Sequence, residues 1–126
     1  MGGDPIPCEA VLFDLDNTLY EYAPCNAAGL LAAEQVLATQ YSLGEGRFQE
    51  LHDMVRGELA EELKGSAASH ERSLFFKRIA ERSSAPEGRG SQPGLAVHMH
   101  EAYWGAFMGC MEPAPHAHGQ LSLLAG

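Results

Sequence analysis

A run of apolar residues that ends in two aspartates constrains this chain more than any other feature. Residues 10–15 read Ala-Val-Leu-Phe-Asp-Leu, and Asp16 follows, so that Asp14 and Asp16 lie two residues apart. A short apolar run bounded by turn-forming residues is typical of a β-strand buried on both faces of a parallel sheet. Ligands of such sheets bind beyond the carboxyl ends of the strands, where these aspartates fall. The sequence therefore predicts a strand over 10–14 with a ligand site at its end.

The two aspartates suit phosphoryl chemistry. Neighbouring carboxylates repel each other, and a bound Mg²⁺ ion removes that cost while it clamps phosphate oxygens. Asp14, held at the strand end, is placed to attack phosphorus and form an aspartyl-phosphate. Asp16 can then act first as the acid for the leaving oxygen and later as the base for water. The alternative interpretation assigns these residues no catalytic role and treats them as a strand followed by an Asx turn.

Residues 11–20, VLFDLDNTLY, resemble motif I of the haloacid dehalogenase-like (HAD) hydrolase superfamily. The resemblance implies an α/β fold with a Rossmann-type core, represented here by its first strand and followed by a mostly α-helical cap of subfamily I. It implies that Asp14 is the nucleophile and a Mg²⁺ ligand. It also implies that Asp16 is the general acid/base, binds Mg²⁺ through its backbone carbonyl, and marks a phosphatase rather than a dehalogenase.

The rest of the motif implies a substrate-contacting loop. Asn17 and Thr18 are expected to contact substrate, because free backbone N–H groups in the turn over 16–18 can cradle an oxyanion. Tyr20 is expected to contact substrate, because it lies with Tyr22 in the segment that covers the site in related enzymes. Residues 69–77 are loosely similar to a cap segment of members close to pyrimidine-5′-nucleotidases. The expected reaction is the Mg²⁺-dependent hydrolysis of a small phosphate monoester, either a nucleotide or a sugar phosphate.

Helical periodicity dominates the chain after the motif. Apolar spacing predicts helices over 26–41, 48–63, from Ser66 or Ser69 to Arg82, over 95–111 and over 118–124. Asn26 is the expected N-cap of the first, and residues 83–94, rich in Gly, Ser and Pro, are an expected loop. The helix over 95–111 is expected to bury one stripe. That stripe contains Val97, His100, Trp104, Phe107 and Met111.

These predictions divide the chain into three parts. Residues 1–22 form the first strand and motif I loop, 23–112 the helical cap, and 113–126 the return to the core. A strand ending in Thr or Ser, a later Lys and an acidic pair, which the superfamily uses to complete its site, do not follow. We therefore expect an N-terminal portion that is a poor catalyst by itself and that associates through its unpaired strand. The alternative function is a non-catalytic helical module that binds a partner.

Composition limits the partners. The 126 residues carry 17 Asp+Glu against 8 Lys+Arg, a formal net charge of -9. We expect no nucleic acid and no membrane as partner, and a small phosphorylated metabolite as ligand. Three separated cysteines and a start without signal-peptide character predict a cytoplasmic protein. The pairs His98/His100 and His116/His118 are alternative candidates for metal ligands. They fit no standard zinc spacing, so we favour the interpretation that they are surface or loop histidines.

Overall fold

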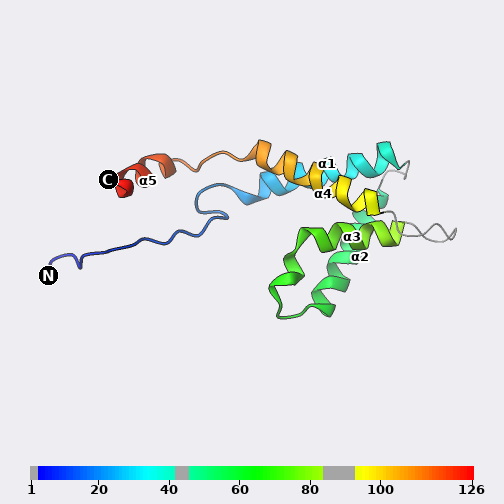
Figure 1. Cartoon of the computed structure of the whole chain (residues 1–126), viewed down its shortest axis with the longest axis horizontal. Coiled ribbons are helices and arrows are strands. Elements are labelled where there is room, and N and C mark those ends of the chain that lie inside the picture. Colours follow the sequence, from blue (N-terminus) through cyan, green and yellow to red (C-terminus); the bar gives the residue numbers. More distant parts are fainter. Residues whose placement is uncertain (1–2, 42–45, 84–92) are drawn as a thin grey trace.

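The computed structural model describes residues 3–41, 46–83 and 93–126. Within these ranges the chain is helical (Figure 1). The elements are α1 (Tyr22–Gln40), α2 (Arg47–Glu62), the 3-10 helix η1 (Ala67–His70), α3 (Arg72–Ser83), α4 (Pro93–Cys110) and α5 (Ala117–Ala125). All five predicted helical segments are thus found, and most of the loop predicted over 83–94 lies outside the described residues.

The α/β fold class with a Rossmann-type first strand is wrong for this structure. Residues 10–14 are extended and exposed, and Leu12 is 95% accessible to solvent. The described residues contain only two isolated β-bridges, Asp16 with Tyr20 and Tyr20 with Pro113, and no sheet. A parallel strand needs a neighbouring strand to pair its backbone groups, and the described ranges contain none. The first residues therefore run away from the helices as an extended segment (Figure 1).

Helices α1 and α4 form an antiparallel pair that carries much of the core (Figure 1). They lie close together at Gly29, where a Cβ atom would be 2.6 Å from Tyr103 Cδ2. From α1 the buried side chains are Cys25, Ala33, Val36 and Leu37. From α4 they are Leu95, Met99, Tyr103 and Phe107. The missing side chain of Gly29 is what lets the Tyr103 ring lie against the α1 backbone.

The predicted buried stripe of α4 is confirmed at Phe107, which is 3% exposed, and is wrong at Val97 and Trp104. Val97 and Trp104 are 53% and 38% exposed, whereas Met99 and Tyr103 are fully buried. Much of the circumference of α4 is apolar, so periodicity alone does not select one face. The selection comes from contact with α1 and α3.

Helices α2 and α3 form a hairpin that packs on α4 through α3. Its inner face is apolar, with Leu51, Val55 and Ile79 fully buried. Its outer face is held by Arg78, which donates to Glu58 at 2.9 Å and to Glu62 at 2.8 Å. These contacts, together with the guanidinium charge, lower the pKa of both glutamates. The hairpin carries the polar side chains that face the motif loop.

The start of α1 differs from the prediction. Asn26 is not the N-cap, because α1 begins at Tyr22. The side chain of Asn17 accepts a hydrogen bond from the Tyr22 backbone N–H at 3.0 Å and so satisfies the first free amide of the helix. None of the helices in the described ranges has the length and apolar character needed to cross a membrane.

Candidate functional site

Asp14 lies at the end of the extended N-terminal segment, and Asp16 lies in the turn that leads into α1. The turn is closed by Leu15 C=O, which accepts from the N–H groups of Thr18 at 3.3 Å and Leu19 at 3.0 Å. Asn17 takes the left-handed conformation, with φ 58°, which Asn tolerates better than most residues. Leu19 C=O accepts from Ala114 N–H at 2.7 Å, so the segment after α4 fixes the end of the turn.

Asp14 and Asp16 are both exposed, but their surroundings differ. Among the described residues, Asp14 has no hydrogen-bond or ion-pair partner. Asp16 Oδ1 accepts a hydrogen bond from the Tyr20 hydroxyl. Tyr20 is only 5% exposed and its ring packs edge-on against Phe107. The Asp14 carboxylate is thus free to approach a ligand, whereas the buried Tyr20 orients the Asp16 carboxylate.

The environment of Tyr20 keeps its hydroxyl protonated. Burial, and then the hydrogen bond to the Asp16 carboxylate, raise the pKa of Tyr20 above its ordinary value. The phenol therefore donates to Asp16 throughout the physiological pH range. Of the three residues predicted to contact substrate, Tyr20 lies in the core, Asn17 caps α1, and Thr18 is exposed in the turn. Their role as substrate ligands stays a prediction.

A cavity of about 310 Å³ opens beside Asp16. It is bounded by the motif turn, the start of α1, η1, α3 and α4. Its lining side chains are Asp16, Tyr22, His70, Glu71, Arg72, Tyr103 and Trp104. The volume falls within the range of about 300–1,000 Å³ typical of small-molecule sites. A ligand there would meet a carboxylate on one side and a guanidinium on another.

Arg72 is the most strongly organised cation of this region. Its Nε donates to Tyr103 Oη at 3.1 Å, and Nη2 donates to Asn26 Oδ1 at 3.2 Å and to the Tyr22 hydroxyl. The guanidinium also lies over the rings of Phe75 and Tyr103, 5.4 and 5.5 Å from their centroids. All of these partners are neutral. Burial acts to lower the pKa of Arg72, but the hydrogen bonds and electrostatic attraction to Tyr103 and Tyr22 raise it on balance, so the charge is permanent.

A second cavity of about 430 Å³ adjoins the first, because Tyr22, His70 and Arg72 line both. It lies between α1, α2, η1 and α3. Its remaining lining residues are Asn26, His52, Arg56, Ala60, Ser69 and Phe75. No Asp or Glu of the described ranges lines this cavity.

His52 lies in the wall of the larger cavity with its Nδ1 atom buried and without a hydrogen-bond partner in the described part of the chain. Asp53 Oδ1 is 3.6 Å from that atom, beyond hydrogen-bond distance. The ring stacks on Phe48, with centroids 6.0 Å apart. Burial lowers the pKa of His52, and the nearby Asp53 only partly offsets it. The folded protein therefore holds this imidazole in its neutral form.

We expect the free energy of unfolding to decrease as the pH falls from about 7 to about 5, owing to His52. The unfolded chain binds a proton on this residue at a higher pH than the folded chain does, so acid favours unfolding. Urea unfolding across this range should show a shallower pH slope for His52→Gln than for wild type. His118→Gln, on the exposed surface of α5, is the control and should keep the wild-type slope. Equal slopes for wild type and His52→Gln would contradict this account.

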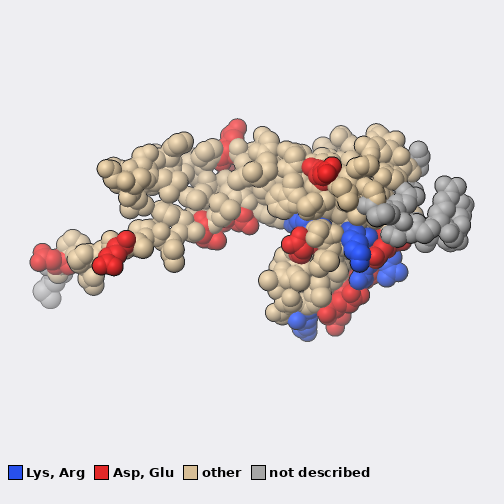
Figure 2. Space-filling view, in the orientation of Figure 1, with Lys and Arg blue, Asp and Glu red and all other residues tan. Residues whose placement is uncertain are grey.

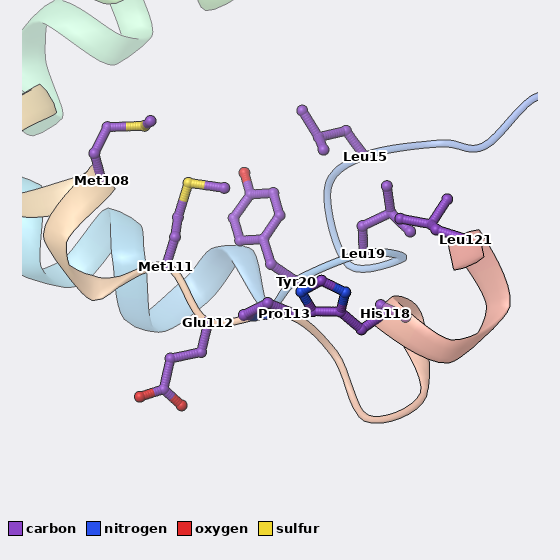
Figure 3. Close-up of a pocket in the computed structure, with 10 residues that line it drawn as sticks. Leu15, Leu19, Tyr20, Met108, Met111, Glu112, Pro113, His118 and Leu121 are labelled. Atoms are coloured by element: carbon purple, nitrogen blue, oxygen red, sulfur yellow. The ribbon is translucent and has the colours of Figure 1, made fainter. Parts of the chain in front are cut away.

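An apolar pocket of about 400 Å³ lies on the other side of the motif turn. Figure 3 shows side chains from the turn, from the end of α4 and from α5 pointing toward it. They include Leu15, Leu19, Tyr20, Met108, Met111 and Leu121. This pocket lies between the turn, the end of α4 and α5. Most of its side chains are apolar, so they offer few groups that could bind a phosphate.

No complete metal site is assembled in the part of the chain that the structure describes. No group of three or more His, Cys, Asp or Glu side chains there is arranged to hold a metal ion. His98 pairs with the Tyr41 hydroxyl at 3.2 Å, and His100 accepts from Trp104 Nε1 at 3.1 Å. Within the predicted site, the oxygen atoms of Asp14 and Asp16 are the available ligands for a metal ion.

Comparison with curated proteins gives a relative of known name. The chain is 43% identical over 109 residues to ribulose-1,5-bisphosphate 5-phosphatase of Halopiger xanaduensis. The matched region is 86% of this chain and 44% of that protein, so the chain spans less than half the length of the relative. No protein-family model matches the chain. No solved structure matches it. The chain is thus similar to a phosphatase that acts on a phosphate ester.

The sequence analysis named the two aspartates as site residues, but neither Asn26 nor any of the basic side chains that line the larger cavity. Asn26 comes from α1, Arg56 from α2, His70 from η1 and Arg72 from α3. Residues so far apart in the sequence have no common spacing that would mark them as a group. The available signal was the placement of basic residues, since every Lys and Arg in the described ranges lies between 47 and 82.

Proposed function

We propose that this chain belongs to a HAD-type phosphatase that hydrolyses a small phosphate monoester through an aspartyl-phosphate on Asp14. The observation that carries the proposal is the 43% identity to a sugar-bisphosphate phosphatase over 86% of the chain. Asp14 is the proposed nucleophile. The adjoining cavities, of which the smaller is lined by Asp16 two residues further on, supply room and charge for the substrate.

Asp14 suits the role of nucleophile because its carboxylate is exposed and has no partner among the described residues. Its oxygen forms the new bond to phosphorus as the bond to the leaving oxygen breaks. Asp16 donates a proton to that leaving oxygen and later takes one from the water that cleaves the aspartyl-phosphate. The hydrogen bond from Tyr20 holds one oxygen of Asp16, which leaves the other for proton transfer.

Mg²⁺ fits the donors of the motif turn. This ion is commonly held by one or two carboxylates together with substrate phosphate oxygens and water, so a preformed cluster of three protein ligands is unnecessary. Asp14, through its carboxylate, and Asp16, through its backbone carbonyl, would hold it. When bound, the ion neutralises charge on the phosphoryl group. This matters in a chain with a formal net charge of -9, which otherwise repels a phosphate ester.

A sugar phosphate is the better substrate candidate of the two classes considered. The relative is named for ribulose 1,5-bisphosphate and for hydrolysis at its 5-phosphate. The lining of the smaller cavity is rich in hydroxyl, carboxylate and imidazole groups, which suit the hydroxyls of a sugar. We therefore propose ribulose 1,5-bisphosphate or a close sugar phosphate as the substrate.

Phosphate release by the intact gene product tests this proposal. The assay should compare ribulose 1,5-bisphosphate, ribulose 5-phosphate and uridine 5′-monophosphate, each with Mg²⁺ and with excess chelator. We expect turnover of the sugar phosphates that depends on Mg²⁺, and faster turnover of the bisphosphate. Absence of phosphate release from all three compounds would contradict the proposal and favour the alternative of a helical binding module.

A further inference from the structure

Among the described residues, Lys and Arg are confined to one region. All of them lie between residues 47 and 82, on α2, on α3 and in the connection after α2. Figure 2 shows the blue side chains gathered over the α2–α3 hairpin, while the visible surface of α4 and α5 carries none. The same region also holds seven Asp and Glu side chains, so its formal net charge is zero, whereas the other described parts are negative. An approaching anion is therefore repelled less by this hairpin than by the rest of the described chain.

Most of these cations are already paired. Arg47 lies 3.2 Å from Glu50, Lys77 lies 3.4 Å from Glu81, and Arg82 lies 2.8 Å from Glu58. Arg78 is held by Glu58 and Glu62. In contrast, neither Arg56 nor Arg72 has a carboxylate within ion-pair distance in the described ranges. Both line the same cavity of about 430 Å³.

Arg72 is presented to this cavity by a neutral frame. Its Nε and Nη2 groups donate to Tyr103, Tyr22 and Asn26, which fix the plane of the guanidinium. Its Nη1 group has no hydrogen-bond partner among the described residues. A part-buried charge is costly unless an opposite charge accompanies it, and here the protein offers only neutral groups. A fixed guanidinium with free N–H groups is well suited to bind phosphate oxygens.

The cavity has the composition of an anion site. Its lining contains two arginines, Arg56 and Arg72, and two histidines, His52 and His70, without any Asp or Glu. The acids Asp16 and Glu71 line only the smaller neighbouring cavity. Glu71 is further occupied at the start of α3, where its Oε1 accepts from the Ser73 N–H and hydroxyl at 3.2 and 2.9 Å. The two cavities therefore separate an acidic end from a cationic end.

We propose that the cavity lined by Arg56 and Arg72 binds the second phosphate of a bisphosphorylated sugar, the phosphate that is not hydrolysed. The proposal rests on the function proposed above, in which the other phosphate is transferred to Asp14. The two cavities share the lining residues Tyr22, His70 and Arg72, and Asp16 lines the smaller one. In this proposal a single ligand extends from Asp16 past Arg72 into the cationic cavity. The site thereby selects sugar bisphosphates over monophosphates.

Binding measured without turnover tests this inference. The intact gene product carrying Asp14→Asn is titrated calorimetrically with ribulose 1,5-bisphosphate and, separately, with inorganic phosphate. Adding Arg56→Gln should raise the Kd for the bisphosphate about tenfold, because a charged hydrogen bond is lost. Arg72→Lys should weaken binding at least as much, because an ammonium cannot keep the contacts with Tyr22, Asn26 and Tyr103 and also donate to a phosphate oxygen.

The control is Arg47→Gln, which removes the same charge from α2 outside the cavity and should leave Kd within about twofold, since screened surface charges contribute little at a distance. Circular dichroism checks that each variant is folded. In the active protein, Arg56→Gln should raise KM for ribulose 1,5-bisphosphate and leave KM for ribulose 5-phosphate unchanged.

The outcomes separate this inference from the proposed function. Active protein whose KM and Kd for the bisphosphate are unchanged by both arginine variants would overturn the inference and leave the phosphatase proposal intact. Binding that depends on Arg56 in a protein without phosphatase activity would support the anion site and overturn the proposed function. Inorganic phosphate binding as tightly as the bisphosphate, with the same dependence on Arg56, would overturn the assignment to a sugar bisphosphate.

Discussion

We expect the Asp14→Asn variant of the intact gene product to lose at least about a thousandfold in phosphate release from ribulose 1,5-bisphosphate, as nucleophile removal does in other covalent catalysts. The amide of Asn is a poor nucleophile and cannot hold a cation as a carboxylate does. The measurement is kcat/KM at saturating Mg²⁺. The matched control is Asp4→Asn, an exposed acid in the same N-terminal segment, which should retain wild-type kcat/KM.

This substitution isolates chemistry from folding. Asp14 is exposed and makes no contact among the described residues that would stabilise the fold. The thermal unfolding midpoint of Asp14→Asn should therefore equal that of wild type. Activity unchanged by Asp14→Asn would contradict the assignment of the nucleophile, whereas lost activity with a lowered midpoint would point to misfolding instead.

The second large effect is expected at Gly29, where α1 meets α4. A methyl group there would lie 2.6 Å from both Tyr103 Cδ2 and Cε2 and 3.0 Å from the Tyr103 backbone oxygen. Tyr103 is fully buried and also hydrogen-bonded to Asn26 at 2.7 Å, so its ring has little freedom to move. We expect Gly29→Ala to lower the free energy of unfolding by about 1–3 kcal/mol, the usual cost of overpacking. Urea unfolding measures it.

A matched glycine provides the control for Gly29. Gly57 lies inside α2, and a Cβ atom there would meet nothing within 4 Å. Gly57→Ala should raise the free energy of unfolding by about 0.5–1 kcal/mol, because alanine loses less backbone entropy in a helix. Equal changes at the two positions would show that the α1–α4 contact is not as close as described.

The helices were predictable because their signal is local. The stripe of Phe48, Leu51, Val55 and Leu59 repeats at helical spacing, and all four residues are buried in α2. The buried face of α4 was not predictable in the same way. Its apolar residues extend around the helix, and Tyr103 rather than Trp104 is buried because Gly29 of α1 leaves room for that ring. The contact between α1 and α4 determines which face of α4 is buried, and apolar periodicity alone does not.

The strand prediction failed for a related reason. Residues 10–14 have the apolar run of a buried strand, but a strand exists only with a partner that pairs its backbone. The local pattern reports a tendency of the segment and carries no information on that partner. In this structure the segment is exposed, and Leu19 and Tyr20 instead contact the chain that follows α4.

The candidate site was also only partly predictable, because some of its residues are close in sequence and others are brought together by the fold. Asp14 and Asp16 lie two residues apart in the sequence, so a local motif could propose them together. Arg56 and Arg72 meet only because α2 and α3 fold into a hairpin. The frame of Arg72 needs Tyr22 and Asn26 from α1 as well as Tyr103 from α4. No spacing in the sequence could assemble these groups.

The central claim is that phosphate-ester hydrolysis proceeds through a covalent bond between phosphorus and Asp14. The most direct test is to quench the intact gene product in acid during turnover of ribulose 1,5-bisphosphate with Mg²⁺, reduce the denatured protein with borohydride, and analyse its peptides by mass spectrometry. An aspartyl-phosphate is reduced to homoserine, so we expect homoserine in place of Asp14 in a fraction of the chains and in none of the Asp14→Asn protein. An unmodified residue 14 during steady turnover, or reduction at another carboxylate, would contradict the account.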